Sequence, residues 1–233
     1  MKLATREAVD WVRMGAWEGE DRPQYAFVFR ATDLESGRKY LCSSHKGWAA
    51  FIVPMKADKE VVKQLGKPVL LSDELEMFGE GARRRDTLAT AMAWAVDARM
   101  KVGMNPFVWT MKVIREAPLL YIPRLRFNQL VETVLDCSDV ELELERATNS
   151  IVARNYRDPA NERRIDGIYF FDFPTPVDRV VVNGFCLGQA VQVLDDDLVP
   201  VRICAHHDVV SLVIGDESRA LTVMATYKER ERV

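Results

Sequence analysis

The pattern of apolar and polar positions in this sequence predicts a short amphipathic helix followed by strands, and this arrangement recurs four times. The first helix is predicted over 5–15, where Thr5 is a good N-cap and apolar side chains follow with helical spacing. Strands are predicted in 24–32 and 38–54, and the turn sequence DLESG at 33–37 joins them. The chain therefore begins with one helix and a strand-rich segment.

The second helix-and-strand unit is less regular than the first. We expect a helix over 71–81, because Ser72 can act as its N-cap and two acidic residues occupy its first turn. The segments 86–96, 98–104 and 107–114 are then predicted as strands. The first two segments also fit a single helix, since Ala and Met are strong helix formers, so both alternatives stay open.

The third helix, predicted over 124–136, has the cleanest amphipathic pattern in the chain. Its apolar residues Phe127, Leu130, Val131 and Val134 follow one another at positions i, i+3, i+4 and i+7. This spacing places all four side chains on one face of a helix.

Strand-like segments fill most of the chain after the third helix. A fourth helix is predicted within 183–197, led by Asn183, with Leu187 and three further apolar residues facing inward. Alternating side chains predict strands on both sides of it. These strands are 140–146, 150–158, 164–173, 199–205, 209–215 and 220–227.

The spacing of the four helices predicts a duplication. The first and third helices lie about 119 residues apart and the second and fourth about 113, so the chain divides into two similar halves. The predicted domains are 1–114 and 115–233, the second with a short charged C-terminal tail, and the natural linker lies around 113–123. We expect an α+β fold with two domains, each a duplicated unit of a helix and antiparallel strands.

The second half of the chain resembles a domain of a known family. The stretch from RVVVNGFCLG to ALTVMA at 179–225 is similar to the final domain of a bacterial DNA polymerase sliding clamp, with a strand, an Asn-led helix and three strands separated by short turns. Residues 125–158 match the first half of that domain. In the first half of the chain, 40–54 and 67–79 resemble clamp segments more loosely.

The resemblance implies a non-enzymatic protein with no cofactor and no metal ion. Sliding clamps encircle double-stranded DNA without reading its sequence, and they bind DNA polymerase and the clamp loader through short peptides. Two domains per chain is the length of viral, eukaryotic and archaeal clamps. A closed ring of six domains then requires a homotrimer with head-to-tail contacts.

The resemblance also implies that basic side chains on the polar faces of the helices meet DNA phosphates. The alternative for each is an ordinary solvated charge, and the three arginines at 83–85 also suit a helix C-terminus. The fourth helix departs from this expectation, because its polar face has no basic residue and three aspartates follow it. The candidate DNA-binding residues are Lys2, Arg6, Arg13, Arg83, Arg84, Arg85, Arg124 and Arg126.

A second implied site is a hydrophobic pocket for partner peptides, beside the linker and the last strand. Aromatic and Met-rich surface suits adaptable peptide binding. The alternative is that Trp48 and Met224 are ordinary core residues. The candidate pocket residues are His45, Lys46, Gly47, Trp48, Pro68, Leu119, Leu120, Val223 and Met224.

Composition and charge fit a cytoplasmic protein, in a bacterial host if the protein is viral. Apolar residues make up 48% of the chain and charged residues 29%, and the net charge of −3 excludes a generally basic nucleic-acid binder. No apolar run approaches the roughly 18 residues of a membrane span, and no secretory signal is visible. The four cysteines are scattered, which is typical of reduced thiols.

The pentapeptide CAHHD at 204–208 is the one cluster that suggests metal chemistry. In a strand, Cys204, His206 and Asp208 would share one face, and three such ligands can hold zinc. However, strand-like segments flank it on both sides, which favours a turn between two strands. No nucleophile or phosphate-loop motif accompanies it.

Two other functions remain alternatives. The segment 96–114 resembles the GLNPF segment of phage single-strand annealing recombinases, in which a helix leads into a strand that begins a hairpin. That interpretation requires 87–100 to be helical. A ring-forming virion structural protein is the other alternative, because it would share short strands and self-assembly but need no basic tunnel.

Overall fold

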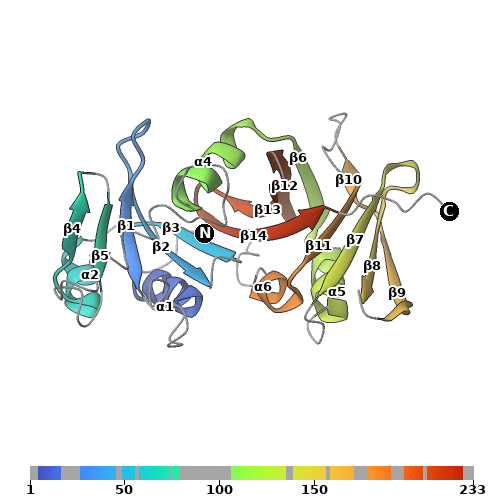
Figure 1. Ribbon diagram of the computed structural model, residues 1–233, viewed down its shortest axis with the longest axis horizontal. Coiled ribbons are helices and arrows are strands. Elements are labelled where there is room, and N and C mark those ends of the chain that lie inside the picture. The colour runs from blue at the N-terminus through green and yellow to red at the C-terminus, as the bar shows by residue number, and fades with distance from the viewer. Residues whose placement is uncertain are drawn as a thin grey trace. The chain divides into compact units, whose positions relative to one another are not determined.

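The computed structural model is an α+β protein whose strands are all antiparallel in their described pairings (Figure 1). Its contacts divide it into unit 1, residues 1–111 with 217–220, and unit 2, residues 112–216 with 221–233. The predicted α+β fold class is confirmed, while the predicted domain boundary at 114/115 stays a prediction. The structure describes residues 5–16, 27–45, 49–55, 58–73, 75–78, 106–134, 139–155, 158–170, 178–189, 197–206 and 209–227.

The elements are short, and most helices are followed directly by strands. In unit 1 they are α1 (Thr5–Gly15), β1 (Val28–Thr32), β2 (Lys39–His45), β3 (Ala49–Pro54), α2 (Asp58–Leu65), β4 (Val69–Ser72) and β5 (Leu75–Phe78). The boundary between the units falls within α4 (Pro106–Glu116). In unit 2 they are β6 (Leu119–Pro123), α5 (Arg124–Val134), β7 (Val140–Glu145), β8 (Ser150–Asn155), β9 (Asp158–Asp166), β10 (Tyr169–Phe170), β11 (Arg179–Val182), α6 (Gly184–Gly188), β12 (Leu198–His206), β13 (Val209–Asp216) and β14 (Arg219–Tyr227).

Unit 1 is a sheet in the order β4-β5-β1-β2-β3 with α1 and α2 packed beside each other. The apolar face of α1 lies over β2 and β3, where the ring of Trp11 meets that of Phe51 edge-on at 5.2 Å. The Ser43 hydroxyl donates a hydrogen bond to the Val12 carbonyl at 2.5 Å. Gly15, the last residue of α1, lies directly against Phe51 and Ser43. This close approach requires glycine, because a Cβ at this position would collide with both side chains. These contacts fix the helix closely on its sheet.

Unit 2 contains the same strand-helix-strands arrangement twice. The first copy runs β6, α5, β7, β8 and β9 with β10, and the second runs β11, α6, β12, β13 and β14. The first strand of each copy pairs with the strand after the helix of the other, β6 with β12 and β11 with β7. The helices α5 and α6 begin at 124 and 184, a spacing of 60 residues. The predicted duplication within this half is therefore visible in its hydrogen-bonded pairs.

Part of the same topology recurs in unit 1. The order β5-β1-β2-β3 in unit 1 corresponds to β11-β7-β8-β9 in unit 2, with α1 and α5 in matching places before β1 and β7. The starts of α1 and α5, at 5 and 124, are 119 residues apart. This spacing agrees with the one that the sequence pattern predicts between the first and third helices.

The predictions for the first, third and fourth helices are confirmed. Helix α1 covers the predicted 5–15, α5 begins at the predicted Arg124, and α6 follows Asn183, whose side chain accepts a hydrogen bond from the Cys186 amide at 2.9 Å. The last three strands are also where the sequence predicts them. The CAHHD sequence lies where β12 ends at His206 and β13 begins at Val209, although 207–208 are outside the described residues.

Two other predictions are wrong. The described residues of 71–81 are not helical, because β4 and β5 form a hairpin there and the alternating Leu75 and Met77 are buried where β5 pairs with β1. The segment 107–114 is not a strand but most of α4, with Pro106 in the first helical position, where proline is favoured. Burial of α4 on several sides removes the polar face that would have revealed its period. The segments 86–96 and 98–104 lie outside the described residues.

Candidate functional site

The paired helices α1 and α2 form the candidate DNA-facing surface of unit 1. Helix α2 is attached near both ends: the guanidinium of Arg13 on α1 donates to the Gln64 carbonyl at 3.1 Å, and Arg30 on β1 donates to the Asp58 carboxylate. Between these points Val61 is fully buried. The opposite side of α2 therefore faces solvent.

Of the predicted DNA-binding residues in unit 1, Arg6 and Arg13 lie on the exposed side of α1. The Arg6 side chain is 86% exposed and lies 3.9 Å from Asp10, one helical turn away. Arg13 is exposed but its guanidinium already binds the end of α2. Lys2 and the arginines at 83–85 are outside the described residues, so their role stays a prediction.

Two further basic residues of unit 1 were not predicted from the sequence. Lys59 and Lys63 are both exposed on α2, one turn apart. The signal that would have found them is the segment DKEVVKQL, in which Val61 and Leu65 share one face and the two lysines share another. Helix α2 is only 8 residues long, so its period is short, and the N-cap and acidic first turn predicted at 71–81 are the stronger helix signal.

The exposed charge on α1 and α2 is balanced. Four exposed basic residues are matched in number by four exposed acidic ones. The basic residues are Arg6, Arg13, Lys59 and Lys63, and the acidic residues are Glu7, Asp10, Asp58 and Glu60. Equal numbers of each sign give this surface little net attraction for a polyanion. Any binding of phosphate here must therefore be weak.

The helices of unit 2 differ in charge. Arg124 and Arg126 are exposed at the start of α5, where the guanidinium of Arg126 donates to the Gln129 side chain at 3.1 Å. Arg163 on β9 is also exposed and donates to the Thr133 hydroxyl near the end of α5 at 3.1 Å. This third arginine was missed because it lies on a strand. The five residues of α6 include no basic side chain, as the sequence indicates.

A network of ion pairs covers the face of β7, β8 and β11 that points away from the core of unit 2. Glu143 accepts from Arg154 at 2.5 Å and from Arg179 at 3.2 Å, and Glu141 lies 3.5 Å and 3.4 Å from the same guanidiniums. Burial opposes ionisation of Glu143, but the two arginines outweigh it, so the pKa of this carboxyl is lower than its ordinary value. The network is a structural feature with no reactive group.

The predicted peptide-pocket residues are distributed over both units. Leu120 and Val223 are 4% and 0% exposed, so they present almost no surface to a peptide. Pro68 and Leu119 are half-buried and present more. His45 and Met224 lie in β2 and β14, and their side chains are not described. Residues 46–48 are outside the described residues, so the pocket stays a prediction.

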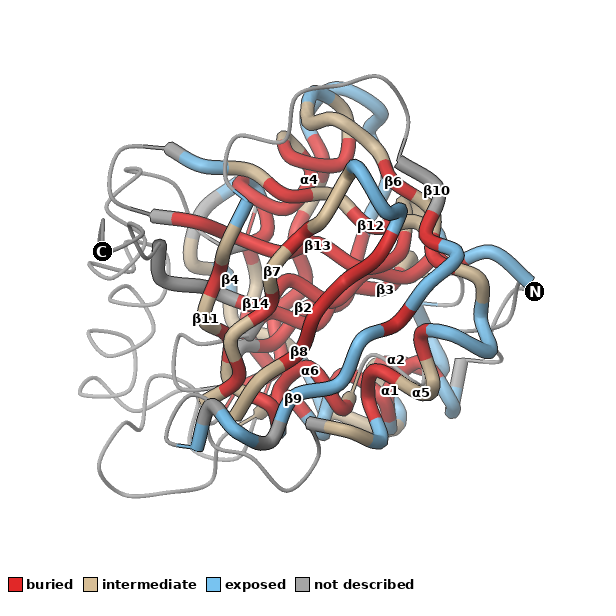
Figure 2. The backbone as a smooth tube through the Cα atoms, turned by 90° about the vertical axis from the view of Figure 1, so that its right-hand side faces the viewer, coloured by how far each residue is buried: buried red, intermediate tan, exposed pale blue. Residues whose placement is uncertain are grey.

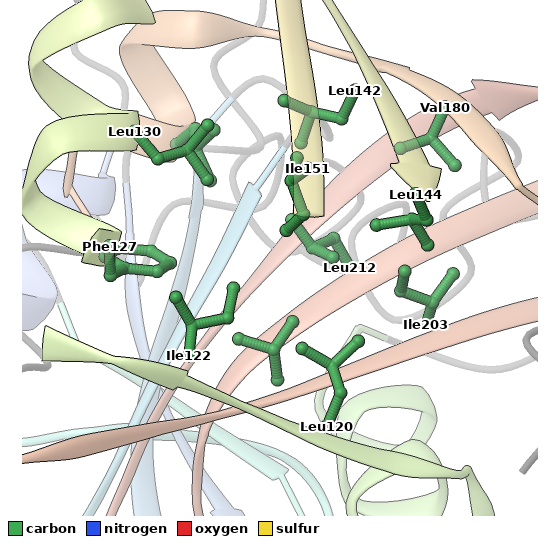
Figure 3. Close-up of a pocket in the computed structure, with 12 residues that line it drawn as sticks. Leu120, Ile122, Phe127, Leu130, Leu142, Leu144, Ile151, Val180, Ile203 and Leu212 are labelled. Atoms are coloured by element: carbon green, nitrogen blue, oxygen red, sulfur yellow. The ribbon is translucent and has the colours of Figure 1, made fainter. Parts of the chain in front are cut away.

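Leu120 instead lines a small cavity inside unit 2 (Figure 3). Its volume is about 20 Å³, and its walls come from α5, α6 and strands of both copies of the repeat. Every lining side chain is apolar, so a water molecule would find no hydrogen-bond partner there. The cavity is a packing gap in the core. The lining residues are Leu120, Ile122, Phe127, Leu130, Leu142, Leu144, Ile151, Val180, Leu187, Val201, Ile203 and Leu212.

The described residues offer little for metal or thiol chemistry. Among them, no group of three or more His, Cys, Asp and Glu side chains is placed to hold a metal ion. Cys42 and Cys186 are buried, and burial raises the pKa of the Cys186 thiol to about 12. Within the same part of the chain, no helix has the length and apolar character needed to cross a membrane.

Comparison with solved structures finds a similar arrangement of elements in bacterial sliding clamps. The chain aligns over 97% of its length with the Helicobacter pylori beta clamp bound to a DNA ligase peptide, with a TM-score of 0.57 and 9% identity. It aligns over 96% with the DNA polymerase sliding clamp of Pseudomonas aeruginosa, with a TM-score of 0.61 and 9% identity. It also aligns over 96% of its length with the sliding clamp, DNA polymerase III subunit beta, of Bartonella birtlesii bound to griselimycin, with a TM-score of 0.61 and 12% identity.

The chain has the fold of a DNA polymerase sliding clamp. The resemblance seen in the sequence is thus confirmed at the level of fold. The chain spans only 64–65% of the length of these three clamps. No protein-family model matches the chain, and no curated protein matches it. The clamp fold here is recognisable in the backbone while nearly all residue identities have changed.

Proposed function

We propose that the protein is a sliding clamp, a non-enzymatic processivity factor that encircles double-stranded DNA and holds replication proteins on it. The observation that carries this proposal is the clamp fold over at least 96% of the chain. Two helices lie side by side in each unit, α1 with α2 and α5 with α6, and exposed basic residues occur on three of the four. Such residues meet phosphates without reading base sequence.

The sparse positive charge of these helices suits sliding. In unit 1 the acidic residues offset the basic ones, and α6 contributes none, so each subunit makes few phosphate contacts. Affinity for DNA falls with salt in proportion to the number of such contacts. A clamp retained on DNA by a closed ring needs little affinity, because topology rather than attraction prevents its escape.

We propose that ring closure uses the strands that end the two sheets within the described part of the chain. Among the described strands, β4 pairs only with β5 and has Leu70 64% exposed, and β9 pairs only with β8 and is exposed along most of its length (Figure 2). Unpaired strand edges are ready templates for pairing with another chain. Head-to-tail pairing of β4 with the β9 of the next copy would generate a homotrimer with six domains.

Partner proteins would bind through short peptides. The Helicobacter pylori clamp that shares this fold is bound to a DNA ligase peptide. We propose the same kind of partner here, including DNA polymerase and a clamp loader. The proteins concerned would be those of replication in a bacterial cytoplasm, and a viral origin is part of the proposal.

Assembly and DNA binding test the proposal together. Size-exclusion chromatography with light scattering should give the mass of three chains at high protein concentration, and Leu70→Asp should shift the population toward monomer, with Leu34→Asp, in an exposed turn of unit 1, as the control. A charge-reversal variant of Arg6, Lys59, Lys63 and Arg126 should lose stimulation of polymerase processivity. A protein that is monomeric at every concentration and has no effect on processivity would refute the proposal.

The structure gives no support to the recombinase alternative. That interpretation places a strand after the helix at 87–100, whereas residues 106–116 form the helix α4. Residues 87–100 themselves are outside the described residues. A virion ring protein would also self-assemble, and the processivity measurement separates it from a clamp.

A further inference from the structure

Arg30 is a buried arginine in the helix-covered core of unit 1. Its side chain is 7% exposed, and it lies under α2 with its charged end over the ring of Phe78 at 5.6 Å. Its Nε donates to the carboxylate of Glu76 on β5, and its Nη1 donates to the carboxylate of Asp58, the first residue of α2. One guanidinium therefore connects a central strand, its neighbour and a surface helix.

The similar strand arrangement of unit 2 has apolar side chains where its strands face the helices. Arg30 on β1 pairs with Glu76 on β5, whereas β7 and β11 in unit 2 pair Leu142 with Val180, although β11 precedes α6 and β5 follows α2. Both of those side chains are buried and apolar and line the core beneath α5. Buried ion pairs seldom stabilise a fold more than well-packed apolar residues of similar size. Packing alone is therefore a weak explanation for the ion pair in unit 1.

Asp58 provides a better explanation. The hydrogen bond of Arg30 to Glu76 stays within the sheet. Its second hydrogen bond, to Asp58, leaves the sheet and holds the start of α2. The other end of this helix is held by Arg13, which donates to the Gln64 carbonyl. An 8-residue helix has little intrinsic stability in water, so its position depends on such attachments.

We propose that Arg30 is a positioning residue that fixes the N-terminus of α2 on the sheet, so that Lys59 and Lys63 are held in place toward a polyanionic partner. The identity of this partner rests on the proposed function, which makes it duplex DNA. The attachment itself does not depend on that function and can be measured separately.

Hydrogen exchange of the full chain, followed by mass spectrometry, tests the attachment. Asp58→Ala and Glu60→Ala each remove one exposed acidic side chain from the first turn of α2, but only the first breaks the bond to Arg30. We expect amides of 58–65 to exchange about tenfold faster in Asp58→Ala than in Glu60→Ala, because a charged hydrogen bond is lost. Equal exchange in the two variants would overturn the proposal.

The double variant R30L/E76V installs the apolar pair of unit 2. We expect the amides of β1 and β5 to keep their protection while those of α2 lose it. The proposal is overturned if the amides of α2 stay protected in the double variant. It is also overturned if the whole of unit 1 loses protection and the two single variants exchange equally, because Arg30 and Glu76 would then be an ordinary core ion pair. Arg38→Met, in an exposed pair with Glu217, is the matched control and should change neither region.

A DNA-binding measurement tests the consequence. The salt dependence of binding to a short duplex should become shallower in R30L/E76V, by about as much as in the variant with Lys59→Gln and Lys63→Gln. An unchanged salt dependence in R30L/E76V, with the lysine variant affected, would overturn the role of Arg30. If the wild-type chain shows no affinity for DNA, the proposed function fails, and the exchange result still decides whether Arg30 holds α2.

Discussion

Units 1 and 2 share one four-stranded arrangement, β5-β1-β2-β3 and β11-β7-β8-β9, but they place charge on opposite sides of it. Unit 1 has Arg30 and Glu76 on the side covered by its helices, where unit 2 has Leu142 and Val180. Unit 2 has its ion pairs on the other side, among Glu141, Glu143, Arg154 and Arg179. The topology accepts either chemistry in the core, so it is the pattern of strand pairing that defines this fold.

The two kinds of ion pair have different physical consequences. A charge buried under a helix is strongly destabilising once its partner is removed, because it cannot regain water. A network at the surface can be weakened one bond at a time with small effects. The following substitutions test this difference, from the largest expected effect to the smallest.

Phe127→Ala should have the largest effect, by emptying the core beneath α5 in unit 2. Phe127 is 1% exposed and lines the cavity that is already present, so we expect a loss of about 3–5 kcal/mol in the free energy of unfolding. The matched control Leu125→Ala, on the same helix but 69% exposed, should cost no more than about 0.5 kcal/mol. Urea unfolding measures both. Equal costs would mean that α5 does not pack as described.

Arg30→Met should destabilise unit 1 by about 2–4 kcal/mol, since it removes both ion pairs of a buried guanidinium and leaves the part-buried Glu76 without its arginine. Replacing both partners, as in R30L/E76V, should recover most of that loss, because unit 2 shows that an apolar pair fits the same topology. Thermal or urea unfolding of the single and double variants gives the comparison. If the double variant is as unstable as the single one, the correspondence between the two units is wrong.

Gly15→Ala should destabilise unit 1 by about 1–3 kcal/mol, because the new methyl group would overlap Phe51 and Ser43. The change should appear in unfolding experiments together with faster exchange in α1. Ala16→Ser, at the next position, serves as the control and should have a much smaller effect. A neutral Gly15→Ala would show that α1 is free to move away from its sheet.

Glu143→Gln should cost about 1–2 kcal/mol at neutral pH by weakening the hydrogen bonds from Arg154 and Arg179. Because the pKa of Glu143 is lowered in the folded state, its contribution is complete above the ordinary value of 4.5 and is lost as pH falls through the folded pKa. The difference between variant and wild type should therefore shrink in acid. Glu162→Gln, at a 55% exposed partner of Arg154, should cost less. A difference that grows on acidification would contradict this assignment.

Unit 2 and the first helix and strands of unit 1 could be predicted from the sequence, whereas α2, β5 and α4 could not. The amphipathic α5 and the alternating strands of unit 2 have one buried and one solvated face, so their periods are visible in the sequence. Helix α4 is buried on several sides, and Glu76 puts a charge on the helix-covered side of β5, which obscures the alternation of that strand. Tertiary contacts also turned the Ser72 region into a hairpin.

The candidate site was predicted only in part. Arg6, Arg13, Arg124 and Arg126 lie on helices, as expected. Lys59 and Lys63 were missed because α2 is too short for its period to stand out, and Arg163 because it reaches α5 from a strand. Leu120 and Val223 are core residues because the faces of β6 and β14 on which they lie are covered. A single sequence does not reveal which face of a strand is covered.

The central claim is that copies of this chain close around DNA. The most direct measurement is to cross-link the subunits in the presence of circular duplex DNA and to wash the complex in high salt, before and after the circle is cut once. A ring predicts that the cross-linked protein stays on the circle despite the salt and leaves when the DNA is linear. Protein that leaves both forms equally, or stays on both, would contradict the claim.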